Sequence, residues 1–338
     1  MSSQRLFIRN CEHFVSPSCH SVQQEADKGV YEAQEWDNTQ YKSVSLLREE
    51  DSLSLIQRII DQLTLSSGVD LSALSMITFS SIHRAGYGAF WQPASYIQEK
   101  TNATKALTCG IQQGCNSQLI ALELIISYLK TNPDADSALT MSVDSFEGSA
   151  FNRWSADYGI LYGDGGAGAI VSKDSGDYEI LSLVTECHGE LNGLHRLPEH
   201  YNDASEDSTI PYNIKVTKKN YLNQFGIEQL SNTSLSAVKQ VTQQCLEQHQ
   251  LTMKDVSKVI LPNLGQKILE NNYLPALDVP LSKTLWSLGS TIGHVGSADA
   301  FISLSHLHKT NALSSGEKVL VISAGSGFTW SALLLEVC

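Results

Sequence analysis

Positive charge is scarce in this 338-residue chain, which holds 23 lysine and arginine residues against 36 aspartate and glutamate residues. The formal net charge at pH 7 is −13. Nucleic-acid binding requires clustered lysine and arginine side chains to neutralise phosphates, and an anionic membrane surface attracts the same clusters. The composition therefore argues against nucleic acid and against a membrane as partners.

Long hydrophobic runs and paired cysteines are lacking as well. No stretch approaches the roughly 18 consecutive apolar residues of a membrane-spanning helix, and the N-terminal segment has no apolar run typical of a signal peptide. The seven cysteines are scattered and form no CxxC pair. We predict neither a disulfide framework nor a metal site, and we expect a cytoplasmic protein.

What is present indicates an α/β fold in two halves. Hydrophobic residues make up 42% of the chain, enough for a large core, and the length suits two units of roughly 150 residues. Segments with strand and helix periodicity alternate, which implies layered sheets and helices. Helix, strand, loop and buried helix recur in comparable order, so we divide the chain into residues 1–175 and 176–338.

The apolar patterns predict individual elements. Strands are expected at Leu6–Val15, Leu74–Ile82, Lys105–Thr108, Ala138–Ser145, Tyr178–Cys187, Val256–Asn263, near Thr284, and at Lys318–Gly325 and Phe328–Val337. Helices are expected at Leu53–Leu63, Pro93–Gln98, Asn116–Lys130, Leu235–His249, Gly265–Asn271 and from Ser297. Ser16–Asp51 is expected to form a loop with short helical pieces, and Glu190–Asn213 a long surface loop. The glycines of YGDGGAGAIVSK (Tyr162–Lys173) predict a tight turn before a strand; the segment lacks the Lys-Ser/Thr of a phosphate loop.

Cys115 precedes the central predicted helix, whose stripe of Leu119, Leu122, Ile125, Ile126 and Leu129 begins close to Asn116. The positive end of a helix dipole and unpaired N–H groups favour a thiolate at this place, which makes Cys115 a candidate nucleophile. The alternative is a small buried residue between strand and helix, because free cysteine is among the most buried residue types.

A second stretch, SLGSTIGHVGSADAFISL, places His294 in a glycine-rich loop before a helix and Asp299 in the first turn of that helix. A carboxylate there can hold the imidazole in one tautomer while the other ring nitrogen faces a nucleophile. A structural loop histidine and a helix-capping aspartate are the alternatives. In SAGSGFTW, a strand ends in a glycine turn, and the N–H of Ser326 can form an oxyanion hole with the N–H of Cys115.

The order of these motifs, with YGDGGAGA, LPN, GHVGSADA and a terminal VISAGSGFTWSALLL, resembles the β-ketoacyl-ACP synthase III family of the thiolase superfamily. The resemblance runs from about Leu74 to Val337. It implies a thiolase-like α/β fold, two duplicated halves forming a five-layered αβαβα core, usually as a homodimer. It implies no permanently bound cofactor, and acyl-CoA or an acyl carrier protein as the donor substrate.

The chain departs from the condensing pattern at two polar positions. Where that family has a catalytic histidine this chain has Asn263, a possible auxiliary polar residue, and where the family has an asparagine it has His294. The set Cys115, His294 and Asp299 resembles the acyltransferase branch found in antibiotic and other specialised-metabolite pathways. That branch moves an acyl group to a hydroxyl, which needs a base beside the acyl-cysteine.

We therefore expect an acyltransferase that forms an ester of a small-molecule hydroxyl acceptor through a Cys115 acyl-enzyme. The alternatives are carbon–carbon condensation and a non-catalytic thiolase-fold partner of an active paralogue. The segment DKGVYEAQEWDNTQYK offers Trp36 and lysines but no arginine to hold CoA, so CoA and a carrier protein both remain possible donors. Five aromatics in predicted loops are candidates for the lining of an acceptor pocket, with scattered surface positions as the alternative: Tyr87, Phe90, Trp91, Tyr201 and Tyr212.

Overall fold

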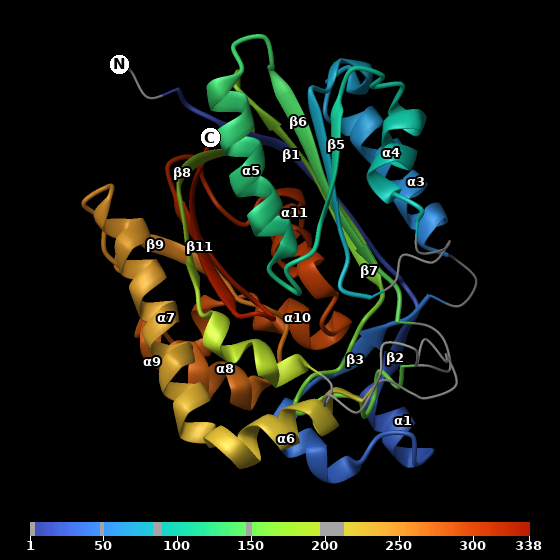
Figure 1. The fold of residues 1–338 in the computed structure, drawn as a ribbon, viewed down its shortest axis with the longest axis vertical. Helices are drawn as coiled ribbons and strands as arrows, with labels where there is room; N and C mark the ends of the chain where they lie inside the picture. Colours follow the sequence, from blue (N-terminus) through green and yellow to red (C-terminus); the bar gives the residue numbers. More distant parts are fainter. Residues whose placement is uncertain (1–3, 48–50, 84–89, 147–150, 197–212) are drawn as a thin grey trace.

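The structure is a computed structural model that describes residues 4–47, 51–83, 90–146, 151–196 and 213–338. Its centre is one large mixed sheet, in which nine strands can be traced within the described residues (Figure 1). Across the sheet they are β5 (Leu107–Ile111), β4 (Met76–Ser80), β6 (Ser137–Asp144), β7 (Gly165–Ser172), β1 (Phe7–Val15), β8 (Tyr178–Cys187), β11 (Thr329–Val337), β10 (Lys318–Gly325) and β9 (Val256–Ile260).

The two halves of this sheet, β5 to β1 and β8 to β9 in the strand order, have corresponding strand pairings. On one side β4 pairs in parallel with β5 and β6, and β6, β7 and β1 follow antiparallel. On the other side β9 and β10 are parallel, and β10, β11 and β8 follow antiparallel. Only two residue pairs, Phe7 with Glu179 and Ile8 with Tyr178, join β1 to β8. This correspondence agrees with a duplicated fold; the boundary at 175/176 stays a prediction.

Helices form the remaining layers (Figure 1). The described helices are α1 (Val22–Asp27), α2 (Trp36–Thr39), α3 (Ser52–Ser66), α4 (Pro93–Thr101), α5 (Ser117–Thr131), α6 (Ile214–Phe225), α7 (Ile227–Glu247), α8 (Gln266–Asn272), α9 (Leu274–Leu277), α10 (Trp286–Ile292) and α11 (Asp299–Lys309). None of these is both long and apolar enough to cross a bilayer.

Three hydrophobic cores define the layer order. The central core packs α5 and α11 against both halves of the sheet, through residues such as Leu122, Phe301, Ala169 and Leu333. A second core lies between α3, α4 and strands β4 and β6, and a third lies between α7, α9 and strands β8 to β11. The arrangement is the expected five-layered αβαβα fold, with the two helices that begin near Cys115 and His294 in its middle layer.

The predicted turn in Tyr162–Lys173 is wrong for three of its four glycines, because Gly165, Gly166 and Gly168 lie inside β7 and Gly163 alone precedes it. A side chain at Gly166 would come within 2.6 Å of the Ser142 carbonyl oxygen, and one at Gly168 within 2.9 Å of Ile59 on α3. Neighbouring strands and a helix approach so closely here that only glycine fits. The glycine pattern therefore reflects packing rather than chain reversal.

Most other predicted elements occur, with shifted ends. Strand β5 lies at Leu107–Ile111 rather than Lys105–Thr108, and the prediction of a strand near Thr284 is met only by an isolated bridge to Val259. Helices α6 and α10 were not predicted, nor was the small hairpin of β2 (Cys19–Ser21) and β3 (Ser43–Ser45). Their short or polar sequences carry little periodicity, so tertiary contacts decide their conformation.

Candidate active site

Cys115 lies between strand β5 and the start of α5, as its sequence position predicts. Asn116 occupies the N-cap position of α5. The preceding turn is tied to the helix by Ser117, whose hydroxyl accepts a hydrogen bond from the Gln113 N–H at 2.6 Å and donates to the Gly114 carbonyl at 2.6 Å. The thiol is therefore held at the N-terminal end of a buried helix.

His294 lies between the end of α10 and a 3-10 turn, η5 (Gly296–Ala298), that leads into α11. Its backbone N–H donates to the Leu161 carbonyl at 2.8 Å, and its carbonyl accepts from the Gly163 N–H at 2.9 Å. Gly293 has φ of 77°, a conformation that favours glycine. The His294 side chain, 1% exposed, is thereby fixed from both sides of its loop.

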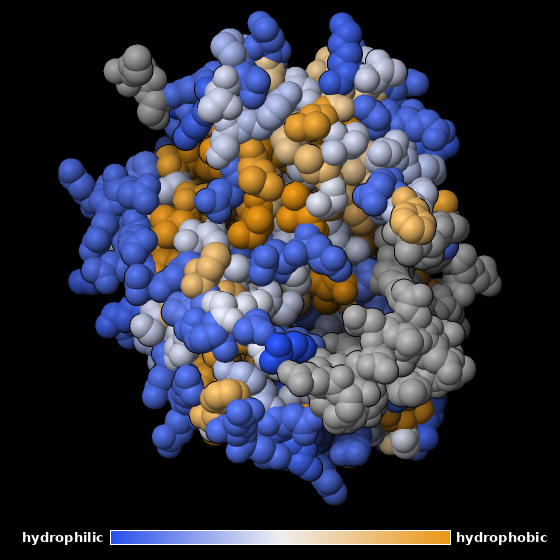
Figure 2. Space-filling view, viewed as in Figure 1, coloured by the Kyte–Doolittle hydropathy of each residue, from blue (hydrophilic) through white to orange (hydrophobic). Residues whose placement is uncertain are grey.

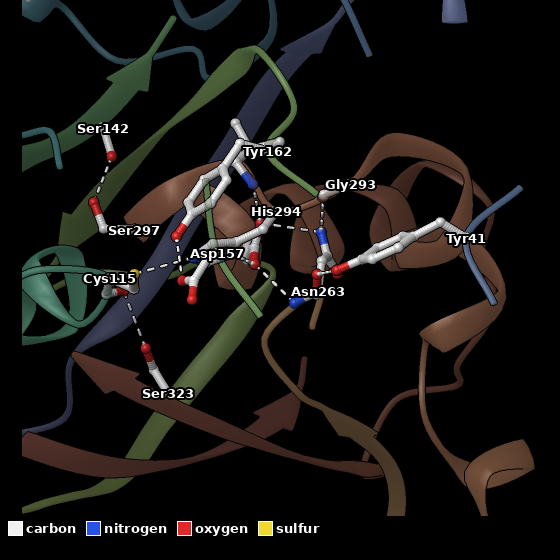
Figure 3. Close-up of polar contacts among 12 residues, drawn as sticks. Tyr41, Cys115, Ser142, Asp157, Tyr162, Asn263, Gly293, His294, Ser297 and Ser323 are labelled. Carbon is white, nitrogen blue, oxygen red and sulfur yellow. Dashed lines mark hydrogen bonds and ion pairs between the residues drawn. The ribbon is translucent and has the colours of Figure 1, made fainter. Parts of the chain in front are cut away.

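The Cys115 thiol, predicted from one motif, lies in contact with the imidazole of the His294–Asp299 pair predicted from another (Figure 3). His294 Nε2 lies 3.0 Å from Cys115 Sγ, and His294 Nδ1 lies 2.6 Å from Asp299 Oδ2. Because a carboxylate can only accept a hydrogen bond, Nδ1 carries a proton and donates a hydrogen bond to Asp299. Nε2 consequently faces the sulfur and can exchange a proton at that end.

Asp299 is itself fixed by three further donors. Its Oδ1 accepts from the Val295 N–H at 2.8 Å and from the Asn263 side-chain amide at 3.0 Å. Its Oδ2 accepts from the Asn263 N–H at 2.8 Å. The buried carboxylate is thus hydrogen-bonded on both oxygens and held against the imidazole.

Asn263 is directed toward Asp299 and the histidine loop (Figure 3). Its amide also donates to the Gly293 carbonyl at 3.1 Å, and its own carbonyl accepts from the Tyr41 hydroxyl at 2.6 Å. A side chain at Gly289 would collide with the Asn263 side-chain oxygen. Both the amide and its surroundings therefore fit a role in supporting Asp299.

Burial by itself would lower the pKa of His294, but the opposite charges of Asp299 and of a Cys115 thiolate outweigh it and raise the pKa well above 6.5. The imidazole is therefore a stronger base than a free histidine.

Tyr162 packs over the His294 imidazole with ring centroids 5.5 Å apart, and the Tyr162 hydroxyl donates to Asp157 at 2.9 Å. Asp157 in turn forms an ion pair with Lys218 at 2.6 Å. Tyr162 opens the YGDGGAGA motif, but no sequence feature indicated a role at the site for Tyr162, Asp157 or Lys218.

The turn after β10 lies against the cysteine loop. Ser323 donates to the Cys115 carbonyl at 3.3 Å, and Gln113 donates to the Ser326 carbonyl at 3.0 Å. A side chain at Gly114 would come within 2.6 Å of the Ser326 nitrogen. The two segments predicted to form an oxyanion hole are therefore adjacent, and the role of the Cys115 and Ser326 N–H groups stays a prediction.

A cavity of about 1110 Å³ opens beside Cys115 and His294, and Figure 2 shows a hollow in the central part of this face. Its aromatic lining residues are Tyr158, Tyr162, Tyr273, Phe328 and Trp330. Of the aromatics predicted to line an acceptor pocket, Phe90 is 97% exposed, and neither it nor Trp91 lines the cavity. Tyr87, Tyr201 and Tyr212 lie outside the described residues.

The segment around α2 forms part of the cavity wall. Asn38 lines the cavity and accepts a hydrogen bond from Lys267 at 3.1 Å. Trp36 is 42% exposed, and its indole donates to the Tyr41 carbonyl at 2.9 Å. In the part of the chain that the structure describes, no group of three or more His, Cys, Asp and Glu residues is arranged to hold a metal ion.

Comparison with known proteins agrees with this architecture. Residues 109–189 match the family model of 3-oxoacyl-[acyl-carrier-protein (ACP)] synthase III, and residues 246–337 match the model of its C-terminal part. The β-ketoacyl-[acyl-carrier-protein] synthase III of Porphyra umbilicalis is 24% identical over 246 residues, and that of Desulfotalea psychrophila is 22% identical over 243 residues. Each alignment covers 72% of this chain and 72% of the relative.

Two solved structures share the fold over nearly the whole chain. The acyltransferase ChlB3 superposes with a TM-score of 0.89 at 24% identity, covering 98% of each chain. The 3-oxoacyl-[acyl-carrier-protein] synthase III of Aquifex aeolicus superposes with a TM-score of 0.79 at 17% identity, covering 98% of this chain and 99% of that one. The two family models together span just over half of the residues, and the chain belongs to the 3-oxoacyl-[acyl-carrier-protein] synthase III family of the thiolase superfamily.

Proposed function

We propose that this protein is an acyltransferase that moves an acyl group from a thioester to a hydroxyl of a specialised metabolite. The observation that carries the proposal is the contact chain from Cys115 through His294 to Asp299, with Asn263 bonded to the carboxylate. The similarity in fold to ChlB3, whose name describes an acyltransferase, supports the same reading.

In the first half-reaction the Cys115 thiolate attacks the thioester carbonyl carbon. The intermediate collapses by breaking the bond to the donor sulfur, which takes the proton from His294 Nε2, 3.0 Å from the cysteine sulfur. The products are an acyl-cysteine, a free donor thiol and a neutral imidazole. Asp299 keeps the Nδ1 proton in place throughout this step.

In the second half-reaction the acceptor hydroxyl attacks the acyl-cysteine. His294 Nε2 takes the hydroxyl proton as the new C–O bond forms, and the C–S bond then breaks to regenerate the thiolate and the imidazolium. Burial lowers the pKa of His294, but Asp299, the largest of the causes that raise it, stays beside the imidazole after acylation and favours the imidazolium that forms in this step. Ester formation consumes the acyl group, and the site returns to its starting charge state.

The donor is an acyl-CoA or an acyl carrier protein. Incubation with either class, followed by intact mass measurement and peptide mapping, is expected to show one acyl adduct per chain on Cys115. A label on Cys109 or Cys187 contradicts the assignment. No adduct with any donor favours the non-catalytic partner reading instead.

Condensation is the second candidate, because the matching family models and the named relatives are synthases. Decarboxylation of a malonyl group would need Asn263 and His294 to act in exchanged positions, and the Asn263 amide is committed to Asp299 and Gly293. We therefore expect no CO₂ release from malonyl thioesters at rates matching acyl transfer. Brisk release would favour condensation over ester formation.

We also propose that the chain forms a homodimer through the face that carries α5. This helix is apolar almost all round, a property of helices buried on every side, yet Leu124 is 44% exposed. Leu107 on the adjoining edge strand β5 is 49% exposed, and hydrophobic side chains gather over α5 in Figure 2. Light scattering is expected to give twice the chain mass, and a Leu124→Lys variant to give the monomer.

A further inference from the structure

We infer that Tyr273 is a specificity-determining residue whose hydroxyl binds a second polar group of the acceptor while the reacting hydroxyl lies at His294. This inference rests on the proposed acyl transfer and concerns a residue that no motif marked. The acceptor class it names is a compound with at least two hydroxyl groups on a hydrocarbon frame.

Tyr273 sits at the junction of α8 and α9, where its N–H donates to the Leu269 carbonyl at 3.0 Å. Its side chain is only 5% exposed and lines the same cavity as Cys115. Among the described residues its hydroxyl has no hydrogen-bond partner, in contrast to Tyr41, Tyr162 and Tyr178, whose hydroxyls all donate to protein oxygens. A buried phenol at a cavity wall without a protein partner is suited to bind a ligand.

The hydroxyl lies within electrostatic reach of the nucleophile. Burial, and in addition the negative charge of a Cys115 thiolate, raise the pKa of Tyr273, so that it remains a neutral phenol. A neutral phenol can donate one hydrogen bond and accept others, which suits an alcohol group better than a carboxylate or an ammonium group. The residue therefore discriminates by hydrogen bonding rather than by charge.

The rest of this chamber is largely apolar. Phe328 and Trp330 are stacked with centroids 5.1 Å apart, and both line the cavity with Leu194 and Leu230. Such walls accept the hydrocarbon frame of an acceptor. Polar side chains also line the cavity, but Asp157 is paired with Lys218 and Ser231 donates to Asn272. A ligand with a second hydroxyl at Tyr273 forms a hydrogen bond with the phenol, whereas a ligand without one leaves the phenol unpaired. A site that leaves a polar group unpaired rejects the wrong ligand more strongly than an apolar pocket does.

The test uses matched probe alcohols on the full chain carrying a preformed acyl-Cys115. Loss of the acyl adduct is timed by intact mass with cyclohexanol and with the 1,2-, 1,3- and 1,4-cyclohexanediols. We expect at least one diol to deacylate the wild type roughly tenfold faster than cyclohexanol, and Tyr273→Phe to remove this preference. Tyr273→Phe should slow deacylation by the preferred diol much more than deacylation by cyclohexanol, which has no second hydroxyl to lose from the phenol.

Tyr178→Phe is the matched control, because it removes a tyrosine hydroxyl that donates to the Leu304 carbonyl in the core, away from the cavity. It should retain the diol preference. A wild type that shows no diol preference, or a Tyr273→Phe variant that keeps it, overturns the inference. If Cys115 is acylated more slowly in Tyr273→Phe while the diol preference is intact, Tyr273 contacts the acyl donor rather than the acceptor, and the inference is also overturned. Failure of Cys115 to be acylated at all is a different result and contradicts the proposed function itself.

Discussion

Replacing Asn263 by alanine tests whether this residue positions Asp299. The substitution removes the side-chain donor to Asp299 Oδ1, at 3.0 Å, and the donor to the Gly293 carbonyl, at 3.1 Å. It leaves the backbone N–H of residue 263 on Oδ2 and the Val295 N–H on Oδ1. The carboxylate therefore keeps three of its four protein contacts, including His294, but loses the side-chain amide that holds Oδ1.

The magnitude follows from the kind of bond that is lost. A hydrogen bond to a charged group is worth about 1.5–3 kcal/mol. If that energy orients the imidazole in the transition state, acyl transfer should slow roughly 10- to 100-fold. Acylation of Cys115 by a reactive thioester should change much less, because the attacking sulfur and its helix position are untouched.

The assay times the two half-reactions separately, acylation by intact mass and transfer by product formation. Gly289→Ala is a second way to disturb the same contact, since a side chain there collides with the Asn263 side-chain oxygen. Thermal unfolding shows whether each variant is folded. Folded Asn263→Ala protein that transfers acyl groups at the wild-type rate would refute the positioning role and leave Asn263 as a packing residue.

Three further predictions follow from the same structure. His294→Ala should abolish acyl transfer while leaving slow acylation of Cys115, as timed by intact mass; transfer at the unmodified rate would make His294 a structural loop residue. The transfer rate should rise with pH as His294 loses its proton; burial lowers the pKa of His294 and Asp299 raises it, so Asp299→Asn should move the midpoint of this rise to lower pH. A midpoint unchanged in Asp299→Asn would separate that carboxylate from the base. Gly168→Ala should lower the free energy of unfolding by about 1–3 kcal/mol in denaturant titrations, because the added methyl meets Ile59 at 2.9 Å; an unchanged value would mean that α3 shifts freely.

Sequence alone determined the features that depend on short stretches of chain. The apolar pattern after Cys115 predicted a helix that starts beside this cysteine, and the glycine loop before Asp299 predicted a helix with Asp299 in its first turn. Helices α5 and α11 begin where these patterns predict. Strands β1, β8, β10 and β11 are long and apolar enough to be identified from their own residues. The relation of His294 to Asp299 was also accessible, because five residues separate them at the start of one helix.

Tertiary structure decided whatever depends on distant segments. Cys115 and His294 are 179 residues apart, and only the packing of α5 and α11 in one layer brings Sγ and Nε2 to 3.0 Å. The glycines of β7 look like a turn in the sequence, because glycine serves chain reversal and close packing equally. The neighbours that require them lie on β1, β6 and α3. The direction of the Asn263 amide and the position of the Tyr273 hydroxyl are likewise set by residues far along the chain. Local sequence carries no signal for either. The hydrogen-bond partners of Asn263 and the cavity beside Tyr273 form only when the two halves of the sheet are assembled.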